Sequence, residues 1–132
     1  MKVVADTRTL LWSIGKSDAL SAAARAAIQD AHNDILISAV SLWEIAVKVR
    51  LGTLVLSFDI EDIPQYCKHL GFTLMPLDPL EALASAALAP KAAHRDPFER
   101  MLVYQCIRNN YTLVSPNSTL SDYQEEGLHY IW

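Results

Sequence analysis

The sequence predicts an α/β protein, a three-layer α/β/α sandwich built on a five-stranded parallel sheet. Short, mostly apolar runs alternate with longer segments of helical periodicity, as in βα units. The runs are continuous rather than alternating in polarity, which is typical of parallel strands buried on both faces. The 132 residues show no internal repeat and no low-complexity linker, so we expect one domain over residues 1–132.

The N-terminal part is predicted to form a strand and two helices. Residues 3–5 are a short apolar run. Apolar residues in segment 7–14 recur at helical spacing, and Gly15 suits the end of that helix. Segment 20–31 is rich in alanine, the strongest helix former, and Ser21 is a suitable cap.

A second strand is predicted at residues 35–37, followed by a helix over residues 40–51. Gly52 is well suited to cap the end of this helix, because glycine readily adopts the left-handed conformation found there. The residues expected on the buried side of the helix are Val40, Trp43, Val47 and Leu51.

The middle of the chain is predicted to form a helix, a strand and another helix. Segment 59–70 has Asp59 as its expected cap, and Pro64 either kinks the helix or delays its start. Residues 73–75 form the third strand, and segment 78–88 begins with an acid–proline pair.

The C-terminal part repeats this pattern. The helix expected over residues 96–109 also begins with an acid followed by proline, which suits a capped helix start. The fourth strand is predicted at residues 112–114, a helical turn near Ser121, and the fifth strand at residues 128–131.

Composition narrows the class of protein. The net charge of −4, with 15 acids and 11 bases, argues against a protein that coats nucleic acid through basic surfaces. Cys67 and Cys106 lack metal-ligand spacing and are expected as reduced core residues. No apolar run is long enough to span a membrane, and the acid at position 6 does not fit a signal peptide, so we expect a cytoplasmic protein.

Polar residues follow the predicted strands, and ligands of open parallel sheets bind beyond the carboxyl ends of strands. Asp6 directly follows the first strand, Asn117 comes soon after the fourth, and Glu44 lies in the helix after the second. Asp96 and Glu99 begin the helix that leads into the fourth strand, so they should reach the same edge. We therefore expect the four acids to gather at one rim.

Clustered carboxylates repel one another, and a hard divalent cation such as Mg²⁺ removes that repulsion. A cation held in this way can activate water and stabilise the oxygens of an in-line phosphoryl displacement. The chemistry predicted from the acids is metal-dependent phosphodiester hydrolysis.

Each candidate also has a local explanation in helix capping. Ser41-Leu-Trp-Glu44 and Asp96-Pro-Phe-Glu99 both have the spacing of a capping box. Asp78 precedes a proline in the same way, and we assign it capping alone. Capping by itself does not require acids from separate segments to meet at one edge.

Basic side chains and histidines lie near these acids in the sequence. Arg8 and Lys48 are predicted to be salt-bridge partners or substrate contacts, and Glu44 with Lys48 is also an ordinary helix pair four residues apart. The histidines lack ligand spacing and are expected at the surface, although His94 and Arg95 could contact a phosphate. These histidines are His32, His69, His94 and His129.

Four blocks occur in order along the chain. They are Val-Val-Ala-Asp-Thr-x-x-Leu-Leu-Trp (3–12), Ser-Ala-Val-Ser-Leu-Trp-Glu-Ile-Ala-x-Lys (38–48), His-Arg-Asp-Pro-Phe-Glu-Arg-Met-Leu (94–102) and Thr-Leu-Val-Ser-Pro-Asn (112–117). Together they resemble the PIN-domain ribonucleases, and the nearest branch looks like the VapC-type toxins of prokaryotic toxin–antitoxin pairs.

The resemblance implies a five-stranded α/β/α sandwich that cleaves RNA endonucleolytically with Mg²⁺ or Mn²⁺. It also implies homodimers and inhibition by a small antitoxin whose C-terminal segment lies over the acidic site. By position, Asp6 and Glu99 match metal-binding acids of the family, Glu44 matches the acid of the second block, and Asp96 matches a frequent companion. Asn117 occupies the position of a further site residue.

Three positions depart from the family pattern. Position 99 is usually Asp, position 117 is usually an acid, and position 8 is often His, whereas this chain has Glu99, Asn117 and Arg8. The first two changes point toward weaker metal binding. The alternative function is therefore a non-catalytic PIN-fold binding module that acts through its antitoxin or another protein partner.

A phosphate-transfer domain on a similar sheet fits less well. A haloacid-dehalogenase-like phosphatase would need a second Asp two residues after Asp6, where the chain has Arg8. A response-regulator receiver would need acids before Asp6, where the chain has Ala5, although Asp78 lies near the position of its phosphoacceptor.

Overall fold

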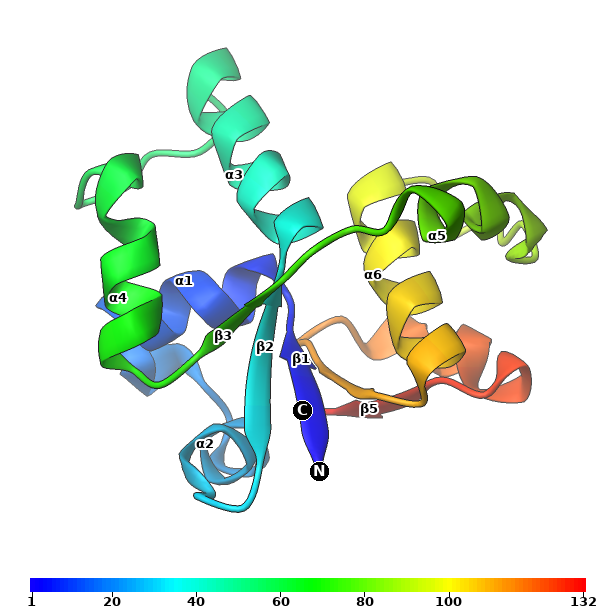
Figure 1. Ribbon diagram of the computed structural model, residues 1–132, viewed down its shortest axis with the longest axis horizontal. Helices are drawn as coiled ribbons and strands as arrows, with labels where there is room; N and C mark the ends of the chain where they lie inside the picture. Colours follow the sequence, from blue (N-terminus) through cyan, green and yellow to red (C-terminus); the bar gives the residue numbers. More distant parts are fainter.

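The computed structural model describes residues 1–132 and contains one five-stranded sheet in the order β3-β2-β1-β4-β5 (Figure 1). All of its strand pairings are parallel. The strands are β1 (Lys2–Ala5), β2 (Asp34–Ser38), β3 (Thr73–Met75), β4 (Thr112–Val114) and β5 (His129–Ile131). The predicted α/β fold with a five-stranded parallel sheet is confirmed.

Helices connect the strands and cover both faces of the sheet. The α-helices are α1 (Thr7–Gly15), α2 (Ala22–Gln29), α3 (Ala39–Leu51), α4 (Ile63–His69), α5 (Pro79–Ala84) and α6 (Pro97–Asn109). The 3₁₀ segments are η1 (Ser17–Ala19), η2 (Ile60–Asp62), η3 (Ser85–Ala87) and η4 (Ser118–Glu126). None of the helices has the length and apolar character needed to cross a bilayer.

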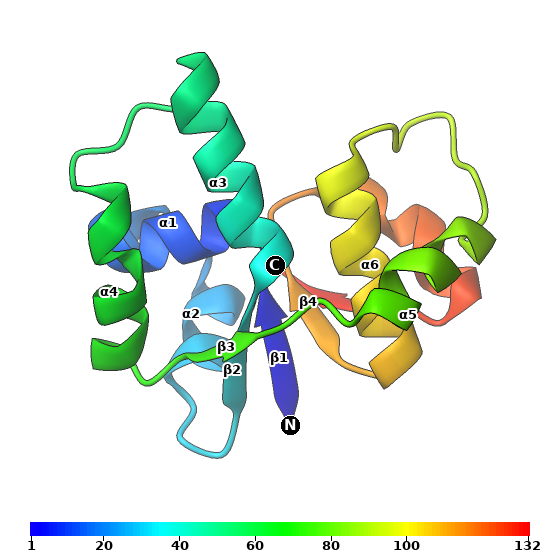
Figure 2. The ribbon, with the colours of Figure 1, turned by 45° about the horizontal axis from the view of Figure 1, so that its top comes forward.

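The central strand β1 contributes to a separate core on each face of the sheet. Val3 packs into a cluster that includes residues of α1, α2 and α4, whereas Val4 packs into a cluster that includes residues of α6 and η4. In Figure 2, α1, α2 and α4 lie on the left and α5 and α6 on the right. Burying one such side chain contributes roughly 1.5–3 kcal/mol, so both layers hold the sheet in place.

Both cysteines are buried and unpaired, as predicted. Burial raises the pKa of the Cys67 and Cys106 thiols, which keeps them protonated at neutral pH. They therefore act as small apolar side chains.

Several element boundaries differ from those predicted. Asp59 makes no side-chain cap, because η2 comes first and α4 begins only at Ile63. Pro64 lies in the first turn of α4, so it delays the helix rather than kinking it. Segment 78–88 divides into α5 and η3, and η4 extends over nine residues where only a turn near Ser121 was expected.

The predicted buried side of α3 is wrong in part, since Val40 is buried and Val47 is half-buried as predicted, but Trp43 and Leu51 are not. Trp43 is 61% exposed and Leu51 is 70% exposed. The helix begins after Ser38, whose hydroxyl caps it, and it turns Glu44 and Ile45 toward the protein. Glu44 is held there by hydrogen-bonding partners, so a buried polar contact fixes the rotation of the helix.

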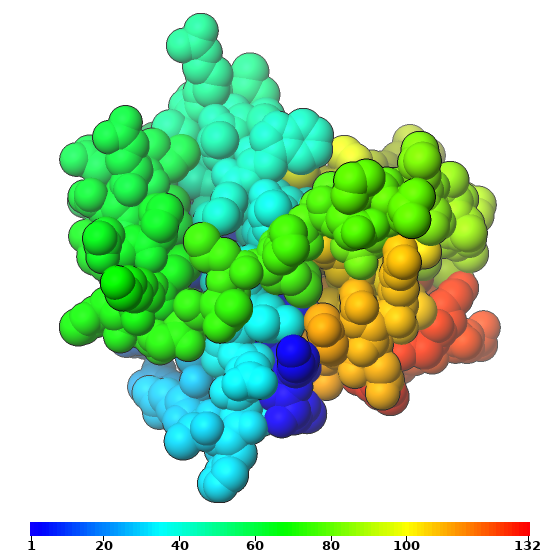
Figure 3. Space-filling view, in the orientation of Figure 1, coloured from blue at the N-terminus to red at the C-terminus, as the bar shows by residue number.

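The connection from β3 to α5 crosses the carboxyl edge of the sheet. In Figures 1 and 3 this green segment passes in front of β2 and continues to α5, which lies beside α6. Gln105 on α6 donates hydrogen bonds to the Pro76 carbonyl oxygen at 3.4 Å and to Glu81 Oε1 at 2.8 Å. These bonds fix α5 against α6.

Candidate active site

The candidate site lies where the strand order reverses. The chain runs from β1 outward to β2 and β3, then returns to the other side of β1 for β4 and β5. Ligands of open α/β sheets bind at the carboxyl edge near such a reversal. Asp6 follows β1 at this point, and its backbone N–H donates to the Val114 carbonyl oxygen of β4 at 3.0 Å.

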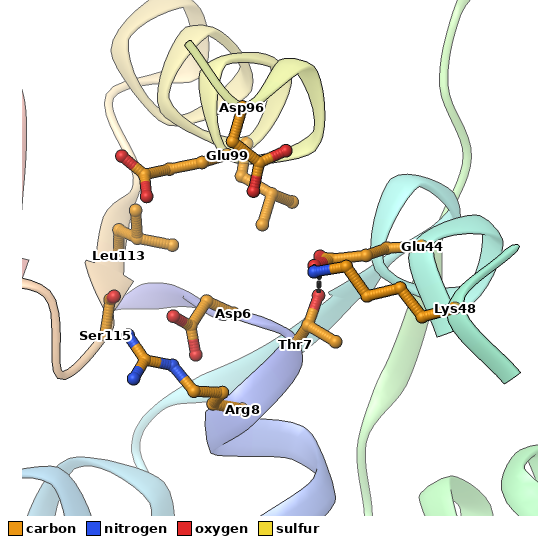
Figure 4. A pocket seen from close by; sticks show the side chains of 10 residues that line it. Asp6, Thr7, Arg8, Glu44, Lys48, Asp96, Glu99, Leu113 and Ser115 are labelled. Carbon is orange, nitrogen blue, oxygen red and sulfur yellow. Dashed lines mark hydrogen bonds and ion pairs between the residues drawn. The ribbon is translucent and has the colours of Figure 1, made fainter. Parts of the chain in front are cut away.

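A cavity of about 310 Å³ lies at this edge (Figure 4). All four acids predicted from the sequence line it, together with two cations, two hydroxyl side chains and two leucines. The lining residues are Asp6, Thr7, Arg8, Glu44, Lys48, Asp96, Glu99, Leu102, Leu113 and Ser115. The acids come from three separate segments of the chain, which topology alone brings together.

Asp6 has a local role and a charge that the protein leaves poorly compensated. Its Oδ1 accepts a hydrogen bond from the Thr9 backbone N–H at 2.8 Å, which caps α1. Burial raises the pKa of Asp6, and hydrogen bonds from Ser115 and Thr9 and the charge of Arg8 only partly oppose this. The ionised carboxylate would therefore be stabilised by a cation in the cavity.

Glu44 is the acid whose charge is balanced within the protein. Thr7 Oγ1 donates a hydrogen bond to Glu44 Oε1 at 2.5 Å, and Lys48 Nζ forms an ion pair with Glu44 Oε2. Figure 4 shows these three side chains together on one wall of the cavity. The predicted helix pair of Glu44 and Lys48 is confirmed. Ser41 makes no capping box, since it lies inside α3.

Asp96 caps α6 and Glu99 lies in its first turn, on the other side of the cavity in Figure 4. Asp96 Oδ1 accepts a hydrogen bond from the Phe98 backbone N–H at 2.9 Å, and Pro97 takes the first helical position. Capping therefore explains the backbone around Asp96, but it does not explain Glu99, whose side chain turns to other partners.

The carboxylate of Glu99 is held by one donor at each oxygen. His94 Nδ1 lies 2.6 Å from Oε1, and Asn117 Nδ2 donates to Oε2 at 2.8 Å. Asn117 also caps η4 by accepting a hydrogen bond from the Thr119 backbone N–H at 3.1 Å. Asn117 is thus not part of the cavity wall, and it reaches the site only through Glu99.

The expected surface position of His94 is wrong, because the residue is only 3% exposed. Its Nε2 faces the Thr119 carbonyl oxygen at 2.9 Å and Asp122 Oδ2 at 3.1 Å. Because both ring nitrogens face acceptors, the surroundings favour the doubly protonated imidazolium form of His94. Burial lowers the pKa of His94, but hydrogen bonds to Glu99, Asp122 and the Thr119 backbone outweigh it, so the pKa is raised.

Sequence reasoning also missed Thr7 and Ser115 as cavity residues. Ser115 directly follows β4 and Thr7 is the second residue after β1, and these positions at the ends of strands were the available signal. The sequence offered less indication that His94 is buried and contacts Glu99. Two of its partners, Thr119 and Asp122, lie 25 and 28 residues further along the chain, too far for any local pattern to show.

The donor types in the cavity fit a divalent cation. Carboxylate oxygens are the ligands that Mg²⁺ and Mn²⁺ prefer. As the side chains lie, no group of three or more acids, histidines or cysteines is placed to hold one ion. Mg²⁺ in nucleotide-processing sites commonly uses one or two carboxylates, with water and phosphate completing its shell. Asp6, Asp96 and Glu99 line the same cavity and supply carboxylates, the type of ligand that this smaller requirement calls for.

Comparison with known proteins identifies the family. The sequence profile of the PIN domain matches residues 3–126, and no match was found among curated proteins. VapBC2 from Rickettsia felis bound to a DNA fragment from their promoter has a TM-score of 0.67 at 15% identity, with 99% of this chain and 98% of that chain covered. FitAB bound to an IR36 DNA fragment has a TM-score of 0.57 at 14% identity, with 98% and 93% covered. The structural likeness shows a shared fold, and the profile match shows that this chain belongs to the PIN domain family.

Proposed function

We propose that this protein is a metal-dependent endoribonuclease, the toxin component of a type II toxin–antitoxin system. The observation that carries the proposal is the meeting of four acids and two cations in one cavity at the sheet reversal. Membership of the PIN family and the VapC-type resemblance support the same conclusion. The proposed reaction is hydrolysis of RNA phosphodiester bonds.

Mg²⁺ or Mn²⁺ is the proposed cofactor. Asp6 on one side of the cavity, with Asp96 and Glu99 on the other, would hold it. When bound, the ion supplies positive charge that stabilises the oxygens around phosphorus during an in-line displacement. Glu44, which Thr7 and Lys48 hold at the cavity wall, would be either a further ligand or the residue that orients the attacking water.

The protein's own side chains would bind and orient the substrate. Arg8 and Lys48 line the cavity and supply the positive charge that an RNA phosphate needs. Glu44 is fixed at the wall and would orient the attacking water by accepting one of its protons in a hydrogen bond. Leu102 and Leu113 give part of the cavity an apolar lining, which strengthens the electrostatic contacts within it.

The proposed partners are an RNA substrate, a small antitoxin and a second copy of this chain. The antitoxin proposal is supported by the two structural neighbours, VapBC2 and FitAB, which are toxin–antitoxin complexes. The homodimer rests on the family resemblance alone. An antitoxin segment lying over the acidic cavity would block access of RNA to Asp6 and Arg8.

One observation favours the alternative, a binding module with weakened catalysis. Both oxygens of Glu44 and both oxygens of Glu99 already have partners within the protein. No three acids are placed to share an ion. Calorimetry with Mn²⁺ separates the two functions, because a binding module would keep antitoxin affinity with at most millimolar affinity for the ion.

The direct test is RNA cleavage with Mg²⁺ or Mn²⁺ by the wild-type chain and by Asp6→Asn. Asparagine is as good a helix cap as aspartate, so this substitution removes the charge and keeps α1 capped. Asp78→Asn is the matched control, since Asp78 caps α5 and does not line the cavity. Equal cleavage by Asp6→Asn and wild type would end the assignment.

A further inference from the structure

His94 lies behind the cavity wall and is connected to it through a single side chain. Its Nδ1 contacts Glu99 Oε1 at 2.6 Å, and Glu99 in turn lines the cavity. The His94 side chain has no exposed surface, whereas that of Glu99 is 25% exposed. His94 therefore cannot contact a substrate, and any effect it has on the cavity passes through the Glu99 carboxylate.

The imidazole is itself held rigidly from the far side. Nε2 donates to the Thr119 carbonyl oxygen and to Asp122, both belonging to η4. The ring also packs on the Tyr123 ring, with centroids 4.8 Å apart. A side chain anchored in this way can donate a hydrogen bond from Nδ1 in one direction only.

Arg100 of α6 makes a second connection to η4. Arg100 Nη1 donates to the Tyr123 hydroxyl at 2.9 Å, and its Nη2 donates to the Leu88 carbonyl oxygen at 3.0 Å. These bonds attach α6, which carries Glu99, to η4 and to the residue that follows η3, so the helix of Glu99 is joined to the element that holds His94 Nε2. The position of His94 depends on this tertiary frame and not on α6 alone.

A glutamate side chain rotates about several bonds, and it loses that freedom when it becomes a metal ligand. We propose that His94 is a positioning residue, which holds the Glu99 carboxylate at the cavity wall in advance and so tightens the binding of a divalent cation. The inference rests on the proposed function and adds a residue to it. Partners behind a metal-binding carboxylate commonly have such an effect.

Two neutral substitutions separate the two ends of the imidazole. The amide nitrogen of glutamine in His94→Gln reaches the place of Nε2, so it keeps the bond to Thr119 and loses the bond to Glu99. The shorter His94→Asn places its amide nitrogen near Nδ1, so it keeps the donor to Glu99. Both variants remove the same positive charge, which makes each the control for the other.

The measurement is calorimetry with Mn²⁺ on the full chain, with thermal denaturation in EDTA as the check on folding. We expect His94→Gln to weaken Mn²⁺ binding by about tenfold and His94→Asn to keep affinity closer to wild type. A purely structural role would instead weaken binding in both variants in step with their loss of stability. Equal weakening, unchanged affinity or tighter binding in His94→Gln overturns the proposal.

A measurement on the wild-type chain removes dependence on variants that fold poorly. In an NMR titration with Mg²⁺, the Nδ1 resonance of His94 should shift as Glu99 takes up the ion, and an unmoved resonance at saturation overturns the proposal. The two proposals fail differently. If wild type binds no Mn²⁺ and Asp6→Asn cleaves RNA equally well, both fail. If Mn²⁺ binding is present, is lost in Asp6→Asn and is unchanged in His94→Gln, only the role of His94 fails.

Discussion

Two helix starts in this protein share the pattern acid-proline-apolar-glutamate, but the glutamates in them have different roles. Asp78-Pro79-Leu80-Glu81 begins α5, and Asp96-Pro97-Phe98-Glu99 begins α6. The caps are alike, since Asp78 accepts from the Leu80 backbone N–H at 2.8 Å and Asp96 from that of Phe98 at 2.9 Å. At the level of local structure the two segments do the same thing.

The glutamates of the two segments differ in their location and in their hydrogen-bonding partners. Glu81 is 6% exposed and accepts hydrogen bonds from Gln105 Nε2 at 2.8 Å and Asn109 Nδ2 at 3.3 Å, so it joins α5 to α6. Glu99 lines the cavity and is held by His94 and Asn117. One carboxylate serves helix packing, and the other faces the candidate active site.

Strand order accounts for the difference. The helix α5 follows β3, an edge strand, whereas α6 begins at the cavity formed where β1 meets β4. A local motif therefore specifies a cap, and the topology decides whether the acid beside that cap can act on a ligand. If this division of roles is correct, substitutions at Glu81 and Asp78 should affect stability alone, and substitutions at Glu99 and Asp96 should also affect the candidate active site.

The largest difference should appear in catalysis. Glu99→Gln should lower RNA cleavage on the order of a thousandfold, because it removes charge that would hold the cation stabilising the transition state. Glu81→Gln should cleave like wild type, since Glu81 lies outside the cavity. Single-turnover cleavage at a temperature where both variants are folded measures the effect. Comparable losses in both variants would contradict the division.

The next difference concerns stability. Glu81→Ala should lower the free energy of unfolding by about 2 kcal/mol, because it leaves the buried Gln105 amide without its closest acceptor. Urea denaturation monitored by circular dichroism provides the measurement. Glu81→Gln, which keeps one acceptor oxygen, should lose less. An unchanged midpoint for Glu81→Ala would show that Glu81 contributes nothing to the packing of α5.

The two aspartate caps should behave alike in stability and differently in metal binding. Alanine at Asp78 or Asp96 should cost about 1 kcal/mol, whereas asparagine should cost little at either position. Only Asp96→Asn should weaken Mn²⁺ binding, because only Asp96 lines the cavity. The comparison fails if Asp78→Asn weakens Mn²⁺ binding to the same extent, as seen by calorimetry.

The smallest effect is expected in the pH dependence of stability without divalent ions. The unfolded chain releases the Asp6 proton near its ordinary pKa of 3.8, and the folded protein releases it at higher pH because the carboxyl is buried. Between these values the folded state binds more protons, so wild-type stability falls as pH rises and stays lower above the window. Asp6→Asn should lose less stability over that range in EDTA, and equal losses in both proteins would contradict the assignment.

Much of the backbone could be predicted from the sequence, because local signals determine it. Ser21 caps α2 through a hydrogen bond from the Ala24 backbone N–H at 3.0 Å, and Gly52 ends α3 with a positive φ of 76°. The strand 73–75 has the predicted bounds. The meeting of the acids at one edge also followed from the sequence, since it depends only on parallel strands and the direction of α6.

The rotation of α3 and the position of His94 could not be predicted, because both depend on tertiary contacts. Trp43 and Ile45 both offer an apolar side to the protein, and the partners of Glu44 decide which one is buried. His94 is buried by residues of η4, a segment for which the sequence indicated only a short turn near Ser121.

The central claim is that Asp6 and the acids of α6 share one divalent cation. A crystal structure of the wild-type chain grown with Mn²⁺ tests it directly through the anomalous signal of the ion. The account predicts a peak in the cavity within coordinating distance of the Asp6 carboxylate and of Asp96 or Glu99. An empty cavity at saturating Mn²⁺, or an ion bound elsewhere with Asp6 unliganded, would contradict it.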